Sequence, residues 1–196
     1  MRTETWTNDV ADTAGATHGT RARAPSERLG LDDLAKMHET KLEELYRGGS
    51  PPKSFFELDG RPKGRMLAVR VAKRGRAFEE LRRFAGAKAF PWGGKSFFKE
   101  TETTGRGINR VRLGPFRFDW YPFDTRVEAS LVDGKDTVLL DYDKAENPFF
   151  IRRIRDEIRE IAPRLFLGPA MWKTDGGGAA HVLWFALDFA DEERGA

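Results

Sequence analysis

The sequence of 196 residues contains no cysteine and only three histidines. The first absence excludes disulfide bridges, thiolate metal ligands, cysteine nucleophiles and iron–sulfur clusters. With so few histidines, a zinc or two-metal site would need a shell of carboxylates, so we predict no metal site. No stretch approaches the ~20 apolar residues of a membrane-spanning helix, and the first residues lack the apolar core of a signal peptide. We therefore expect a cytoplasmic protein that does not insert into a membrane.

Common nucleotide-binding and hydrolase motifs are absent as well. The chain has no Gly-x-x-x-x-Gly-Lys-Ser/Thr loop, no Gly-x-Gly-x-x-Gly turn opening a helix after a strand, no Gly-x-Ser-x-Gly and no His-Glu-x-x-His. No reaction class follows from the sequence, which leaves open whether the protein is an enzyme and gives no oligomeric state.

Large apolar side chains and an uneven charge distribution are present. The chain holds 15 Phe and 5 Trp, enough for one sizeable core. Residues 61–117 carry 16 Lys and Arg against 4 Asp and Glu. Such a basic segment with interleaved aromatics could bind single-stranded nucleic acid, but solvated strand faces explain it more simply, and we do not expect a nucleic-acid partner.

The organisation along the chain predicts one domain. Residues 1–28 have almost no large apolar side chains to offset the entropy of ordering, so we expect a disordered tail there. One barrel domain over residues 29–190 and a short C-terminal tail over 191–196 complete the prediction.

Three segments have features of helices. Apolar residues recur every three to four positions over 31–45 and stop at Gly48-Gly49, and residues 78–84 form a shorter run of this kind. In the third segment, Asn147 is a favoured N-cap, Pro148 fits the first helical position and four isoleucines form one stripe up to residue 161. We predict a helix over 148–161 whose charged face is solvated.

The remaining segments alternate apolar and polar residues as strands do, with Trp92-Gly93-Gly94-Lys95 interpreted as a turn and Asp133-Gly134 as a hairpin signal. The predicted strands span 65–71, 96–102, 108–113, 116–121, 125–131, 137–142, 165–172 and 179–189.

These elements predict an α+β, mainly β fold. It is a curved or closed antiparallel barrel of about eight strands, with an N-terminal helix and one helix before the last hairpin. The stretches Leu139–Asp143, Glu146–Pro148, Ile154–Glu160 and Leu165–Ala170 resemble the C-terminal half of uncharacterised bacterial calycin-like proteins, which are lipocalin-type barrels. Leu58–Gly64 is similar to the entry into a calycin first strand, with Pro62 where an aromatic is expected. The resemblance implies a barrel around a hydrophobic cavity.

The predicted barrel and its cavity suggest candidate ligand-binding residues. Phe118 and Trp120 share one strand face with Phe116 and make a wide aromatic wall, which either packs in the core or lines a cavity. Arg126 is a candidate anchor for an anionic or carbonyl group, unless it simply pairs with Asp141 or Glu128. The candidate ligand-binding residues are Phe118, Trp120, Arg126, Tyr142 and Trp184.

Catalytic candidates are Asp141, Tyr142 and His181. In a regular strand, His181 shares a face with Leu183 and Phe185, where it could act as a general base or a haem ligand. Its place beside a glycine turn also fits a half-exposed histidine without a role, and we predict no resident cofactor. The expected function is binding of a lipophilic or amphipathic small molecule in the barrel. A cofactor-independent cyclase, isomerase or lyase that acts on an apolar substrate in the same cavity is the alternative.

Overall fold

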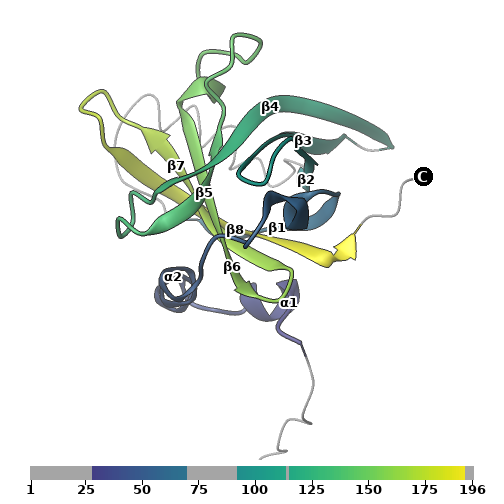
Figure 1. The fold of residues 1–196 in the computed structure, drawn as a ribbon, viewed down its shortest axis with the longest axis vertical. Helices are drawn as coiled ribbons and strands as arrows, with labels where there is room; N and C mark the ends of the chain where they lie inside the picture. Colours follow the sequence, from purple (N-terminus) through teal and green to yellow (C-terminus); the bar gives the residue numbers. More distant parts are fainter. Residues whose placement is uncertain (1–27, 70–91, 114, 193–196) are drawn as a thin grey trace, which may run out of the picture.

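The structure is a computed structural model that describes residues 28–69, 92–113 and 115–192. Eight strands form a closed barrel in which every strand pairs antiparallel with the next and β8 returns to β1 (Figure 1). The predicted mainly β fold with a closed antiparallel barrel is confirmed. The strands are β1 (Pro62–Val69), β2 (Trp92–Lys99), β3 (Thr104–Leu113), β4 (Phe116–Ala129), β5 (Asp136–Asp141), β6 (Ile154–Ala162), β7 (Leu165–Lys173) and β8 (Ala179–Glu192).

Two short helices, α1 (Leu31–Leu34) and α2 (Glu39–Gly48), replace the single helix expected over 31–45. The chain bends between them, and the His38 side chain accepts a hydrogen bond from Thr40 N as the N-cap of α2. Both helices lie outside the barrel wall (Figure 1). Leu42 and Tyr46 pack there against Trp184 in an outer core layer. No helix of the described residues is long and apolar enough to cross a membrane.

The barrel interior is filled at one end. The 3-10 segment η1 (Phe55–Leu58) contributes two side chains to the interior cluster at this end. Phe97 packs against Phe123 and Phe189, with ring centroids 5.4 and 5.6 Å apart. Gly107 leaves the space for Phe123, because a Cβ at this glycine would lie 2.3 Å from the ring. Aromatic packing thus closes this half of the barrel.

The predicted helix over 148–161 is wrong. This segment forms a short 3-10 turn, η2 (Ile151–Arg153), followed by strand β6, which pairs with β5 and β7. Ile154 and Ile158 do share a face, as the helical spacing required, but residues four apart also share a face in a strand. The isoleucine spacing is therefore compatible with both structures.

Most charged residues of β6 are buried, contrary to the predicted solvated face. Arg155, Glu157 and Arg159 point to the outer side of the barrel wall, where they are 7%, 0% and 0% exposed. Glu157 accepts hydrogen bonds from Tyr46 OH of α2 at 2.8 Å and from Arg155 Nε at 2.9 Å. Arg159 binds Asp133 with two hydrogen bonds of 2.9 and 2.8 Å. These polar groups fasten α2 and the β4–β5 turn to the barrel.

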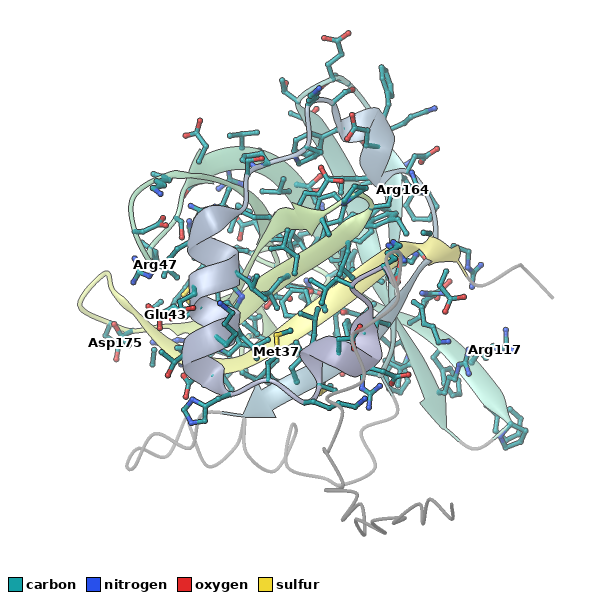
Figure 2. All side chains as sticks on the ribbon, turned by 90° about the horizontal axis from the view of Figure 1, so that it is seen from below. Met37, Glu43, Arg47, Arg117, Arg164 and Asp175 are labelled. Carbon is teal, nitrogen blue, oxygen red and sulfur yellow. The ribbon has the colours of Figure 1, made fainter. Side chains whose placement is uncertain are left out.

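Other strand boundaries also differ from expectation. The two strands expected over 116–121 and 125–131 are one continuous strand, β4, which extends with β3 as an arm beyond the barrel body (Figure 2, where Arg117 marks the arm). Strand β8 continues to Glu192, past the predicted end of the domain at 190. The predicted tail over 1–28, apart from residue 28, and the predicted helix over 78–84 lie outside the described residues.

Candidate binding site

The half of the barrel away from the packed rings of Phe97, Phe123 and Phe189 contains a cavity of about 100 Å³. Its wall is predominantly apolar, with three polar side chains and a tyrosine hydroxyl at one place. The lining residues are Met66, Trp92, Lys95, Asn109, Tyr121, Tyr142, Ile151, Ile154, Asp156, Ala170, Met171, Val182, Leu183 and Phe185.

Three irregularities in the strands surround this cavity. The register of β2 against β3 skips Gly93, so Trp92 and Lys95 both face the interior although they are three positions apart. Gly94 takes a φ of +117°, which glycine adopts easily. The Trp92-Gly93-Gly94-Lys95 stretch is therefore a bulge within a strand and not the predicted turn. Bulges of this kind re-aim side chains and are common next to functional sites.

The second and third irregularities lie in β4 and β8. Tyr121 is the extra residue where β4 passes Ile108 and Asn109 of β3, and it has a φ of +60°. Val182 is the extra residue between the pairs Ala170↔Leu183 and Met171↔His181. Tyr121 and Val182 both line the cavity, so each bulge directs a side chain into it.

A buried lysine is the centre of the polar group. Lys95 is 3% exposed, and its Nζ donates hydrogen bonds to Asn109 Oδ1 at 2.8 Å, to Tyr142 OH at 2.5 Å and to Asp156 Oδ2 at 2.9 Å. These partners come from β3, from the residue after β5 and from β6. Tyr142 OH in turn donates to Asp156 Oδ2 at 3.0 Å. All three ammonium protons are thus satisfied within the barrel.

Asn109 is held in place by further contacts. Its Oδ1 accepts from Trp92 Nε1 at 3.1 Å, and its Nδ2 donates to Tyr142 OH at 3.1 Å and to the backbone oxygen of Tyr121 at 3.3 Å. Such connected networks fix side-chain orientation and define one arrangement of the interior.

The surroundings shift the ionisation of two groups in this cluster. Burial lowers the pKa of Lys95, and the nearby Asp156 carboxylate opposes that effect. Burial also raises the pKa of the Tyr142 hydroxyl well above its ordinary value, with a further contribution from Asp156. Lys95 Nζ lies 5.2 Å from the ring centroid of Phe185 and 5.5 Å from that of Trp92. These π faces partly replace the hydration that the ammonium group loses.

Asp156 carries a carboxylate oxygen that accepts no hydrogen bond from the described residues. It lines the cavity and is only 4% exposed. Its Oδ2 accepts from Lys95 and Tyr142, whereas its Oδ1 is buried and has no hydrogen-bond partner within residues 28–69, 92–113 and 115–192. A buried acceptor without a donor costs about 1–3 kcal/mol, and more when it is charged. A residue of the cavity wall therefore carries one strong acceptor that has no donor among the described residues.

Of the residues predicted from sequence, the structure brings Tyr142 to this cavity. Arg126 lies on the outer surface with its side chain 44% exposed, and it forms ion pairs with Glu128 and Asp141. Of the two alternatives predicted for Arg126, the structure therefore has the ion pair. Asp141 also binds Lys173 at 3.1 Å and accepts from Asp143 N in the following turn. Neither Arg126 nor Asp141 lines the cavity.

His181 and Trp184 lie on the outer side of the wall. Because of the bulge at Val182, His181 does not share the interior face with Leu183 and Phe185, as a regular strand would require. The His181 ring packs edge-on against Trp184 at 4.8 Å, and its Nδ1 lies 3.7 Å from Glu39 of α2. Trp184 is 1% exposed within the outer core layer. Both side chains therefore belong to the contact with the helices.

Phe118 and Trp120 lie on the arm formed by β3 and β4. Their rings stack on each other with centroids 5.0 Å apart, and Trp120 remains 38% exposed. Trp120 lines an open surface hollow with Pro122 and Asn147. The predicted aromatic wall thus exists, but it does not line the cavity inside the barrel.

Sequence reasoning missed Lys95 and Asp156. Lys95 was assigned to a turn, and Asp156 to a solvated helix face. The available signal was Lys95 two positions before Phe97, which is the spacing of two residues on one face of a strand.

The residues described by the structure contain no group of three or more His, Asp or Glu placed to hold a metal ion. No family model matches the chain, and no curated protein matches it. A solved structure that resembles it is a protein from Thermomonospora curvata, with a TM-score of 0.47 and 18% sequence identity. The alignment covers 81% of this chain and 89% of that protein.

Proposed function

We propose that the barrel binds a small, largely apolar molecule that carries one hydrogen-bond donor, such as a hydroxyl group, and that this donor binds Asp156 Oδ1. The observation that carries the proposal is the buried Oδ1 of Asp156, which has no hydrogen-bond partner among the described residues and belongs to a residue that lines a predominantly apolar cavity. Ligand sites are typically apolar with a few convergent polar groups.

Charge and size narrow the ligand class. Lys95 and Asp156 form an ion pair at 2.9 Å, so the described residues that line the cavity carry no net charge that would call for an ionic ligand. Cavities on the order of 150 Å³ hold a benzene-sized ring, and this one is about 100 Å³. The flexible thioethers of Met66 and Met171 line it and can adjust to a guest. A short chain with a hydroxyl group fits this volume as it stands, and a single ring fits once the two methionine side chains move aside.

Two probes of equal size test the role of the donor. Benzyl alcohol and ethylbenzene differ by a hydroxyl in place of a methyl group. A hydrogen bond to a charged acceptor contributes about 1.5–3 kcal/mol, so the protein should bind the alcohol roughly 10- to 100-fold more tightly. Titration calorimetry or ligand-observed NMR measures both affinities.

Two isosteric variants separate binding from stability. Asp156→Asn should reduce the preference for the alcohol to a few-fold. Asp133→Asn is the matched control, because Asp133 is also buried and paired with a cation, Arg159, but lies outside the cavity. It should keep the full preference even where it lowers stability. Equal binding of the two probes by the unmodified protein would end the proposal.

An enzymatic role in the same cavity is the second candidate, because an amine, a phenol and a carboxylate lie within hydrogen-bonding distance of one another. Such groups transfer protons in isomerases and lyases. Exchange of α-hydrogens of phenylacetaldehyde for deuterium, followed by NMR in D₂O, distinguishes turnover from binding alone. A rate that Tyr142→Phe abolishes would favour the enzyme, whereas saturable binding without exchange favours the carrier.

A further inference from the structure

Resting on the proposed function, we infer that Lys95 is a nucleophile that forms an imine with small apolar aldehydes entering the cavity. The inference is carried by geometry: the amine, a proton acceptor and a proton donor meet at one point of the cavity wall. Lys95 Nζ is 2.9 Å from Asp156 Oδ2 and 2.5 Å from Tyr142 OH, and all three residues line the cavity.

The setting suits an amine that must lose its proton. A lysine reacts with a carbonyl only as the neutral amine, and removal from water favours that form. Lys95 is 3% exposed and lies in a wall made mainly of apolar side chains, so its amine has lost most of its contact with water. Burial lowers the pKa of Lys95 accordingly. The apolar wall also binds the hydrocarbon part of an aldehyde and holds its carbonyl near the amine.

The neighbouring groups account for each proton of the reaction. Lys95 first passes one ammonium proton to Asp156, which leaves a neutral amine beside a neutral acid. The nitrogen lone pair attacks the carbonyl carbon, and a second proton moves from nitrogen to the carbonyl oxygen through the Tyr142 hydroxyl to give the carbinolamine. Asp156 then returns its proton to the leaving hydroxyl. Water departs, and the carbon–nitrogen double bond forms as an iminium ion that faces the Asp156 carboxylate.

The overall change is one ammonium group plus one aldehyde giving one iminium ion plus one water, with no oxidant or reductant. The ion pair between Lys95 and Asp156 is thereby replaced by an equivalent pair between the iminium and Asp156. Because the charge of the interior is the same before and after, the buried site does not have to accommodate a new charge.

Reductive trapping tests this inference on the full chain. Benzaldehyde and cyanoborohydride are added near neutral pH, and the rate of benzylation is followed at individual lysines by peptide mass spectrometry. Lys41 is the reference amine, because its side chain is 58% exposed and lies on α2 outside the barrel. We expect Lys95 to be labelled several-fold faster than Lys41, because the cavity holds the carbonyl of the aldehyde beside its amine and burial lowers its pKa.

Two further measurements link the reaction to the site. Excess benzyl alcohol should suppress labelling of Lys95 while leaving Lys41 unchanged. Tyr142→Phe should slow labelling of Lys95 by about tenfold to a hundredfold, because it removes the proton donor but keeps the ring. A small phenol added to the Tyr142→Phe variant should not restore the labelling rate of Lys95, because the phenol itself would occupy the cavity.

The outcomes separate this inference from the proposed function. If benzyl alcohol binds but Lys95 reacts no faster than Lys41, the nucleophile is refuted and the binding site stands. If Lys95 reacts faster than Lys41 but benzyl alcohol neither binds nor protects it, the proposed hydroxyl site fails and the nucleophile stands. If neither binding nor selective labelling is observed, both fail.

Discussion

Arg155→Ala is the substitution that most clearly separates a buried strand from a solvated helix over residues 154–161. The Arg155 side chain is 9% exposed and pairs with Glu157, which is fully buried, and with Glu128. Removing one partner of a buried ion pair costs about 3–5 kcal/mol, because the remaining charge is left uncompensated. We therefore expect the variant to lose a large part of the stability of the domain.

The matched control is Arg152→Ala, three positions earlier. Arg152 pairs with Asp143 at 2.6 Å, but the two side chains are 45% and 52% exposed. Exposed ion pairs contribute about 0–1 kcal/mol. Urea denaturation followed by tryptophan fluorescence measures both variants. With a slope of about 2 kcal/mol per molar urea, the two midpoints should differ by roughly 1 M or more.

A second substitution tests the cause of the loss. Glu157→Gln in the Arg155→Ala background removes the unpaired buried charge and keeps one acceptor oxygen for Tyr46 and Ser130, although Leu131 N loses its acceptor. The double variant should recover part of the lost stability, giving a coupling free energy of roughly 1–3 kcal/mol. Small and equal effects of Arg155→Ala and Arg152→Ala would refute the burial of the β6 charges.

Three other predictions concern the helix contact, acid stability and the cavity. Tyr46→Phe should lower the free energy of unfolding by about 1–3 kcal/mol, because Glu157 loses a buried donor at 2.8 Å, as denaturation would show. Hydrogen bonds from Arg159 lower the pKa of Asp133 to about 2 from 3.8, so stability from this carboxylate is present above pH 4 and lost as the pH falls towards 2. The free energy of unfolding of Asp133→Asn should therefore fall less between pH 4 and pH 2 than that of the unmodified protein. An unchanged pH dependence would contradict the role of Asp133. Trp120→Ala should leave the affinity for benzyl alcohol within about twofold, whereas Trp92→Ala should weaken it about tenfold through lost apolar contact; the reverse order would place the ligand on the arm.

Much of the barrel can be predicted from the sequence, because its signals are local. Alternating residues and turn signals such as Asp133-Gly134 identify most strands, and closure follows from having many short strands without a covered edge. The segment 148–161 could not be assigned in this way. Its isoleucines satisfy the spacing of a helix, and its charges look solvated because their partners, such as Tyr46 and Asp133, come from distant parts of the chain.

The cavity was less predictable than the barrel, because bulges decide which side chains enter it. A single extra residue at Gly93, Tyr121 or Val182 changes the face that the next residues occupy. The expectation that His181 faces the interior failed for this reason. The spacing of Lys95 from Phe97 is the local signal for its burial, but the groups that compensate its charge could not be predicted, since its three acceptors come from three other segments.

A crystal structure of the protein soaked with benzyl alcohol tests binding in the barrel interior most directly. We expect the ring between Met66, Trp92 and Phe185, with the hydroxyl oxygen about 2.5–3.0 Å from Asp156 Oδ1. The side chains of Lys95 and Tyr142 should keep their positions. A cavity filled by rotated protein side chains, or an alcohol bound only at the surface hollow beside Trp120, would contradict the proposed site.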